Sequence, residues 1–149
     1  MEKYFISTVR YDKLMENGSV KTVNKQYLIE ALSFTEAESR TVEELKPYIS
    51  GDFTIPTIVK PRINELVQAE NPLADRWYKV KLSLITIDEV TATEKKTSCQ
   101  ILVSAATFEE AYQELLKHMQ GTVSDYEIAS IVETAIKDYF PASNGKNDI

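Results

Sequence analysis

Residues 27–37 read YLIEALSFTEA, and residues 101–111 read ILVSAATFEEA. The two segments share five of eleven residues. Two further segments, DFTIPTIV at residues 52–59 and DYEIASIV at residues 125–132, share four of eight, and Tyr4-Phe5 falls against Trp77-Tyr78. The three matches keep the same order, at a spacing of 73 or 74 positions. Because similar segments at a constant spacing indicate a repeated structural unit, we predict an internal duplication.

Each copy of the first segment carries a capping box, in which a hydroxyl side chain is followed three residues later by a glutamate. The two boxes are Ser33 with Glu36 and Thr107 with Glu110. This pattern predicts helices over residues 34–46 and 108–119, and the apolar residues of the second recur at helical spacing. Residues that stop helices follow both segments: Pro47, Gly51 and Gly121.

Before each helix, every second side chain belongs to one set and the side chains between them to another, which is the pattern of a β-strand. Two such strands in succession predict a β-hairpin. Asn17-Gly18 predicts a tight turn in the first copy. In the second copy we expect a looser turn over residues 88–96, followed by a strand over residues 97–105.

The segment after the second helix, residues 125–140, fits helix and strand alike. Its counterpart in the first copy contains Pro56 and Pro61, which the interior of a helix would not tolerate. We therefore predict strand in both copies, with Pro56 at an edge position or at a bulge.

These elements predict an α+β fold, built as a tandem duplication of a ββαβ unit with a pseudo-two-fold. We expect antiparallel sheets with about six strands in all and two helices, and the strand order 2-1-3 within each unit. Residues 1–142 would form a single duplicated domain, with repeat 1 at about 1–66, a connector at 67–75 and repeat 2 at about 76–141. Residues 143–149 are expected to be a loose tail.

Composition limits the class of protein. The chain has 149 residues, of which 43% are hydrophobic and 27% charged, and a net charge of −6. This balance is typical of a soluble globular domain and disfavours non-specific binding to nucleic acid. The chain has a single cysteine, no signal-like N-terminus and no apolar run long enough to span a membrane. We therefore expect a cytoplasmic protein that does not bind membranes.

Residues for catalysis or metal binding are scarce, so the sequence assigns no catalytic residue and no metal ligand. His118 is the only histidine and Cys99 the only cysteine, which excludes a Cys/His zinc site of about four ligands. We interpret His118 as a helix-end residue that complements the helix dipole, and Cys99 as a buried, inert thiol. The four glycines are scattered, which excludes the dinucleotide fingerprint and the P-loop, and no cofactor is expected.

Two groups of acidic residues leave alternatives open. The glutamates of the first helix are interpreted as a solvated face rather than a metal site; they are Glu36, Glu38, Glu43 and Glu44. Asp52 and Asp125 stand at equivalent positions in the two copies. Such a pair of carboxylates can serve acid–base catalysis, whereas turn formation before a strand is the simpler interpretation.

One predicted surface carries side chains suited to binding. It lies on the first strand of each copy and faces away from the predicted helix. Its candidate ligand-binding residues are Tyr4, Arg10, Trp77, Lys79 and Lys81. An aromatic ring beside cations on an open sheet can stack on a base while the cations hold phosphates. The alternative interpretation is a solvated or self-association surface, because Trp and Tyr also mark protein interfaces.

Three segments resemble a known family: ADRWYKVKL at residues 74–82, SDYEIAS at residues 124–130 and ALSFTEAE at residues 31–38. The family consists of small proteins of Bacteroidota and their phages and is defined only as a domain of unknown function. The resemblance runs from about Tyr4 to Pro141. It implies a bacterial or phage cytoplasmic setting, and it supplies no activity, cofactor or catalytic residue.

Three functional hypotheses follow. The first is a non-enzymatic binding protein, a protein-interaction module whose partner is another protein or a second copy. The second is a protein that sequesters a small anionic nucleotide, such as a cyclic dinucleotide, and so acts against host defence. The third is a carboxylate-based hydrolase, which we rank last. Its distinguishing feature would be a carboxyl group with a strongly perturbed pKa in a cleft, which a sequence does not show.

Overall fold

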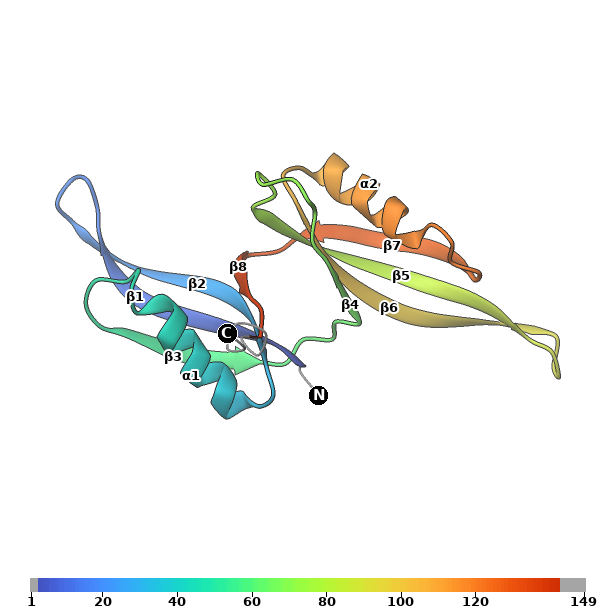
Figure 1. The fold of residues 1–149 in the computed structure, drawn as a ribbon, viewed down its shortest axis with the longest axis horizontal. Coiled ribbons are helices and arrows are strands. Elements are labelled where there is room, and N and C mark those ends of the chain that lie inside the picture. Colours follow the sequence, from blue (N-terminus) through green and yellow to red (C-terminus); the bar gives the residue numbers. More distant parts are fainter. Residues whose placement is uncertain (1–2, 143–149) are drawn as a thin grey trace, which may run out of the picture. The chain divides into compact units, whose positions relative to one another are not determined.

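The computed structural model describes residues 3–142 and has an α+β fold, as expected (Figure 1). Its elements are β1 (Lys3–Leu14), β2 (Val20–Ala31), α1 (Phe34–Leu45), β3 (Phe53–Val59), β4 (Glu65–Val67), β5 (Arg76–Asp88), β6 (Thr93–Ala105), α2 (Phe108–Met119), β7 (Asp125–Glu133) and β8 (Ile136–Phe140). Both predicted helices are confirmed. Neither is long and apolar enough to cross a membrane, and the same holds of every helix in residues 3–142. The tail expected at residues 143–149 lies outside the described residues.

The described strands form two sheets of four strands each. Their orders are β3-β1-β2-β8 and β4-β6-β5-β7. The chain divides into two compact units: unit 1 contains the first sheet and α1, and unit 2, Arg62–Thr134, contains the second sheet and α2. Each sheet includes three strands in the predicted order 2-1-3, with the first strand of the hairpin at the centre.

The expectation of about six antiparallel strands is wrong, because each sheet has a fourth strand that is parallel to its neighbour. β8 pairs with β2, and β4 pairs with β6. β4 spans the predicted boundary between repeat 1 and the connector and is only three residues long, too short for an alternating pattern to show. β8 follows β7 after only Thr134 and Ala135, so the sequence reads as one strand. The duplication and its pseudo-two-fold stay predictions.

The core of unit 1 lies between its sheet and α1. Its buried residues are Phe5, Val9, Tyr27, Ile29, Ala31, Ala37 and Leu45. The strand members alternate along β1 and β2, so they share the face that α1 covers. At the start of α1, the Phe34 ring meets the Phe5 ring edge-on with 4.8 Å between centroids.

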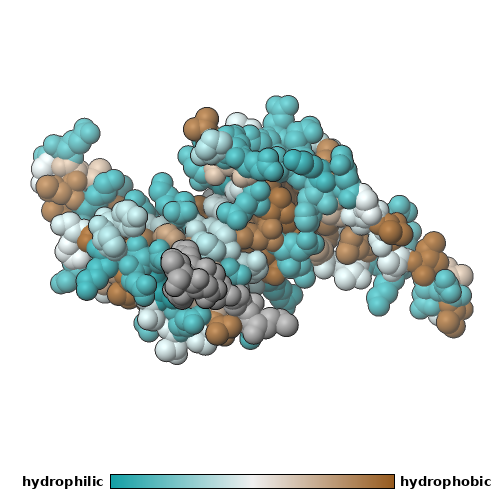
Figure 2. Space-filling model, in the orientation of Figure 1, coloured by the Kyte–Doolittle hydropathy of each residue, from teal (hydrophilic) through white to brown (hydrophobic). Residues whose placement is uncertain are grey.

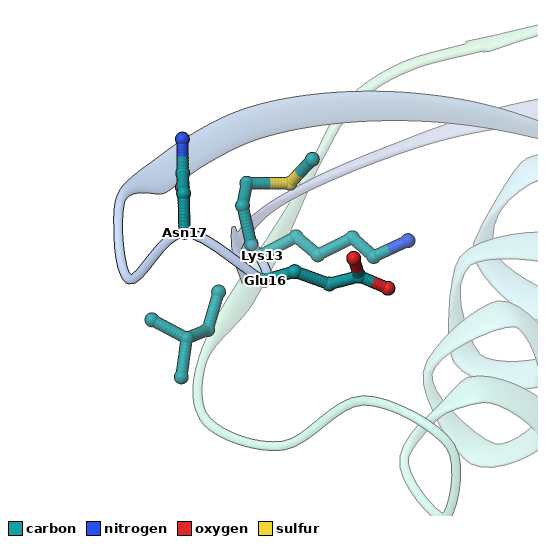
Figure 3. Close-up of a pocket in the computed structure, with 5 residues that line it drawn as sticks. Lys13, Glu16 and Asn17 are labelled. Atoms are coloured by element: carbon teal, nitrogen blue, oxygen red, sulfur yellow. The ribbon is translucent and has the colours of Figure 1, made fainter.

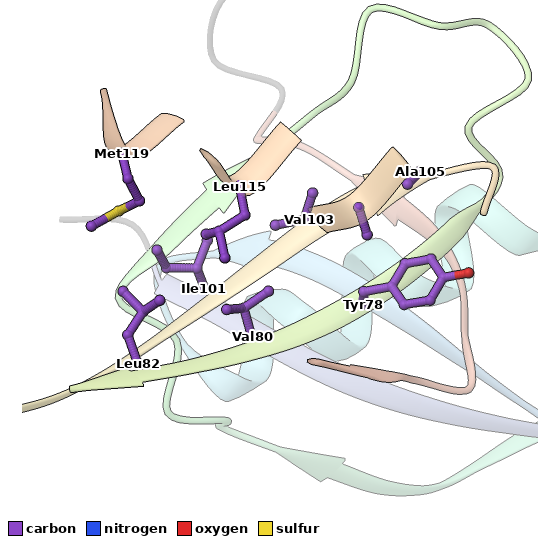
Figure 4. Packing of buried hydrophobic residues seen from close by; sticks show 9 residues of the cluster. Tyr78, Val80, Leu82, Ile101, Val103, Ala105, Leu115 and Met119 are labelled. Carbon is purple, nitrogen blue, oxygen red and sulfur yellow. The ribbon is translucent and has the colours of Figure 1, made fainter. Parts of the chain in front are cut away.

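Unit 2 has a core of the same construction (Figure 4). Its buried residues are Tyr78, Val80 and Leu82 from β5, Ile101, Val103 and Ala105 from β6, and Ala111, Leu115 and Met119 from α2. On β5 these residues alternate with Trp77, Lys79 and Lys81. The prediction that those three side chains face away from the helix is therefore confirmed.

The edge strands β3 and β7 carry bulges at corresponding places. In β3, Ile55 and Pro56 stand opposite Val9 alone, because the register shifts between Thr8 and Arg10. In β7 the register shifts in the same way beside Ala129. Proline has no N–H to donate, so an edge strand with a bulge accommodates it. Both alternatives predicted for Pro56 are confirmed together.

Both hairpins end in short loops. The turn predicted at Asn17-Gly18 is confirmed: the Gly18 amide donates to the Met15 carbonyl at 3.0 Å, and Gly18 has a φ of 86°, which glycine adopts readily. The second loop is tighter than expected. The Ala92 amide donates to the Asp88 carbonyl at 2.7 Å, so β6 begins at Thr93 rather than at residue 97.

Candidate interaction surface

The five candidate binding residues belong to two different units. Tyr4 and Arg10 lie on β1 in unit 1, and Trp77, Lys79 and Lys81 lie on β5 in unit 2. Within unit 2 the last three residues share one face of the sheet. Each unit therefore carries its own candidate residues.

Trp77 is buried, with 5% of its surface exposed, whereas Lys79 and Lys81 on the same face are exposed. The amide and the hydroxyl of Thr134 both donate to the Trp77 carbonyl at 2.8 Å, which holds the chain after β7 beside this residue. The expectation of an uncovered aromatic ring is wrong. An indole has a large apolar surface whose burial is favourable, and a buried ring offers no platform for a base.

Tyr4 and Arg10 have partners within unit 1. The half-buried Tyr4 ring lies 6.5 Å from the Tyr139 ring of β8, measured between centroids. Arg10 is exposed, and its Nε donates to Asn24 Oδ1 on β2 at 3.0 Å. Both contacts are explained by the sheet itself, and the role of these two residues in ligand binding stays a prediction.

Two hollows lie at the end of the β1–β2 hairpin in unit 1. The larger has a volume of about 410 Å³ (Figure 3) and is lined by Lys13, Leu14, Met15, Glu16 and Asn17. The smaller, of about 330 Å³, is lined by residues 11–14 of the hairpin and residues 48–50 of the loop after α1. Leu14 and Lys13 line both, so the hollows form one indented surface.

Exposed apolar side chains gather at these hollows. Leu14 is 71% exposed, Val20 63% and Tyr48 81%, and the flanking Met15 is also exposed. Leu14 and Val20 are register partners on neighbouring strands, so their side chains lie side by side. Hydrophobic surface is visible at this end of unit 1 in Figure 2. We call Leu14, Met15, Val20 and Tyr48 the hairpin patch.

The hairpin patch was not recognised in the sequence. Its signal was present, because apolar Leu14, Met15 and Val20 flank the polar turn at Asn17-Gly18. Such residues fit a strand equally well when a core covers them. Leu14 and Val20 lie on the face of the sheet opposite α1, and neither belongs to the buried core of unit 1.

In unit 2, the contacts of His118 and Cys99 are those of residues that stabilise the fold. His118 Nε2, in the last turn of α2, lies 2.8 Å from Glu65 Oε2 on β4, a contact that joins the helix end to the edge strand. Cys99 is half-buried against the core. Burial raises the pKa of its thiol, and Glu65 adds to this effect. A raised pKa keeps the thiol protonated and slow to react, as interpreted from the sequence.

The acidic residues of α1 have structural contacts. Glu36 Oε1 accepts a hydrogen bond at 2.7 Å from the amide of Leu32, the residue before the cap at Ser33. Glu44 lies 3.7 Å from Arg40. No group of three or more potential metal ligands occurs within residues 3–142. Asp52 belongs to unit 1 and Asp125 to unit 2, and turn formation before a strand stays the favoured interpretation of both.

Comparison with models of known families gives a match over all of the described residues. The model of a domain of unknown function, DUF4494, matches residues 3–142, which include both units. The chain belongs to the DUF4494 family. The predicted resemblance to a family of unknown function is thereby confirmed for this DUF4494 protein, while the bacterial or phage setting stays a prediction. A search of curated proteins found no match.

Proposed function

We propose that this DUF4494 protein is a non-enzymatic protein-interaction module, and that it pairs with a second copy of itself through the hairpin patch. The exposure of Leu14, Val20 and Tyr48 around the two hollows supports this proposal. Large apolar side chains gathered on one surface are typical of interaction sites. Fully burying a side chain such as Leu14 or Val20 contributes about 1.5–3 kcal/mol, before the cost of association.

The charges around the hairpin patch favour a second copy as the partner. Lys13 and Lys21 are register partners, and the acidic side chains of Asp12 and Glu16 stand close by along the chain. In a two-fold contact the same surface meets itself. A surface that carries both signs can place each charge against its opposite, whereas a surface of one sign would repel its own copy.

The proposal is tested by sedimentation of the full chain over a range of concentrations. We expect a reversible dimer for the unmodified protein. Leu14→Asp places a charge in the apolar centre and should raise the dimer dissociation constant about 100-fold, equivalent to a loss of about 3 kcal/mol. Val123→Asp is the matched control, because Val123 is also exposed but lies in unit 2. A protein that stays monomeric throughout, or a Leu14→Asp variant that dimerises unchanged, would overturn the proposal.

The contacts of the candidate residues speak against the nucleotide-binding and hydrolase hypotheses. A nucleotide held by stacking requires an accessible ring, and Trp77 is buried. A hydrolase requires carboxylates available for chemistry, and two of those considered are engaged, Glu36 in a helix cap and Glu44 beside Arg40. The bacterial or phage cytoplasm remains the proposed setting and rests on the sequence resemblance.

We further propose that the two units arose by duplication. Corresponding features support this: a capped helix of the same length, a bulge in the third strand and a parallel fourth strand occur in both units. Selection for one function does not require such matched irregularities, whereas a common origin produces them. Self-pairing is consistent with this history, because an ancestral single unit would have needed a partner to complete its core.

A further inference from the structure

The C-terminal strand β8 is held by the edge of β2 through several kinds of contact. Tyr27, Leu28 and Ile29 are parallel register partners of Asp138, Tyr139 and Phe140. The Phe140 ring stacks on the Tyr27 ring with centroids 5.8 Å apart, and Ile136 is buried. The edge of β2 is therefore a built groove for one short parallel strand.

Glu30 and Arg40 hold the end of this strand. Glu30 Oε1 accepts from the Tyr139 hydroxyl at 3.0 Å and from the Ala142 amide at 2.9 Å. Arg40 donates through one terminal nitrogen to the Glu30 carbonyl and through the other to the Pro141 carbonyl, the latter at 2.6 Å. Hydrogen bonds to charged groups are the stronger kind, so these two residues fix the position of the chain after β8.

The sheet of unit 2 is also completed by a short parallel strand, β4. β4 pairs with β6 in parallel, with Leu66 opposite Leu102, and the Ala69 amide beyond it donates to Ser104 Oγ at 2.8 Å. In each unit the added strand directly follows the third strand of the other unit along the chain: β4 follows β3, and β8 follows β7. The two units thus exchange their fourth strands within one chain.

We propose that β8 also docks on β2 of a second copy, so that two chains pair by exchanging their C-terminal strands. The contacts of β8 are the same whichever chain supplies β2. Whether β8 binds its own β2 or the β2 of a second copy then depends on the chain concentration relative to the effective concentration of the tethered strand. Only Thr134 and Ala135 separate β8 from β7. Exchange of an identical strand between two copies is a low-cost route to a dimer, because every contact of the strand is formed again in the partner.

The test is a cross-link that only exchange can form. Cys99→Ser is introduced first, so that no native thiol interferes. One chain then carries Gln26→Cys and a differently tagged chain carries Ile136→Cys, because these positions are register partners between β2 and β8. The two chains are unfolded together, refolded together and mildly oxidised. A disulfide between them requires β8 of one copy on β2 of the other.

We expect a cross-linked heterodimer whose ratio to monomer rises about tenfold when the chain concentration rises tenfold, while monomer predominates. Gln26→Cys mixed with Val123→Cys is the control for random collision, because Val123 is exposed and lies in unit 2. A second pair, Tyr27→Cys with Asp138→Cys, keeps the buried Ile136 in place. Cross-linking of both pairs no higher than the control would overturn the inference.

This inference stands apart from association through the hairpin patch. Leu14→Asp, added to both chains, should leave the cross-linked fraction unchanged, because Leu14 pairs with Val20 at the opposite end of β2 from the residues that bind β8. Loss of the cross-link in that background would mean that exchange depends on the patch and does not occur through β8 docking alone.

Discussion

Ser7 and Thr41 form a polar contact inside the core of unit 1. Both side chains are fully buried, and their hydroxyl oxygens are 2.8 Å apart. Thr41 donates its own hydroxyl hydrogen to the Ala37 carbonyl at 2.7 Å, so Ser7 is the donor to Thr41. A buried hydroxyl with a partner is tolerated, whereas one without a partner costs the full desolvation of the group.

Thr41→Val should therefore destabilise the protein by about 1–3 kcal/mol, because the shape is kept but Ser7 loses its acceptor. The double variant Ser7→Ala with Thr41→Val should recover part of this loss, because it removes both polar groups. Chemical denaturation of the two variants and of Ser7→Ala gives the coupling between the residues. If the double variant is less stable than Thr41→Val by the full effect of Ser7→Ala, the hydrogen bond has no energetic role.

Substitution of Trp77 tests whether its ring has a structural role or a binding role. Trp77→Ala should destabilise the protein by about 3–5 kcal/mol, because a large buried ring is removed. Lys79→Ala and Lys81→Ala are the matched controls on the same face, and each should stay within about 0.5 kcal/mol of the unmodified chain. Thermal denaturation measures all three. A Trp77→Ala variant as stable as the lysine variants would show that the ring is not part of the packed structure.

At the scale of elements, the two helices begin with the same hydrogen bonds. The Ser33 hydroxyl accepts from the Glu36 amide, and the Thr107 hydroxyl accepts from the Glu110 amide, both at 3.1 Å. The glutamates reach back in turn, and Glu110 Oε1 accepts from the Ala106 amide at 2.9 Å. The first turn of a helix has amides without helical partners, so these bonds define where each helix starts.

Ser33→Ala and Thr107→Ala should each lower the free energy of unfolding by about 1 kcal/mol through loss of the cap. Ser39→Ala is the control, because it makes the same change on the exposed surface of α1, where alanine favours the helix. Melting temperatures of the three variants make the comparison. Equal behaviour of Ser33→Ala and Ser39→Ala would rule out a capping role for Ser33.

At the scale of the whole molecule, β4 and β8 tie the two units together through the chain. β8 completes the sheet of unit 1 although it follows β7, and β4 completes the sheet of unit 2 although it follows β3. A unit that unfolds therefore releases a strand that belongs to the other half of the chain. We expect the two units to unfold in one transition.

Trp77, the only tryptophan, reports on unit 2, which allows this expectation to be measured. Thr41→Val lies in unit 1. It should shift the denaturation midpoint seen by tryptophan fluorescence as much as the midpoint seen by circular dichroism, since a cooperative transition has one midpoint for all probes. Two separate transitions, or an unchanged fluorescence midpoint, would mean that the units unfold independently.

Several features of this fold were accessible from the sequence because their causes are local. Ser33 and Thr107 predict where the helices start, since a cap involves residues three positions apart. Alternation along β5 correctly assigns Tyr78 and Trp77 to opposite faces of the sheet, since successive side chains of a strand point to opposite faces. Pro56 indicates an edge strand with a bulge for an equally local reason, the missing N–H.

The pairing of β4 and β8, the burial of Trp77 and the exposure of the hairpin patch were decided only by the tertiary structure. Leu14 and Leu28 are both leucines on the same face of the β1–β2 hairpin, yet Leu14 is exposed and Leu28 is fully buried. Side-chain chemistry and alternation are the same for both. What differs is which distant segments of the chain lie against each position, and Leu28 is a register partner of Tyr139, more than 100 residues away. Contacts over such separations depend on the whole packing arrangement, which no local pattern of residues encodes.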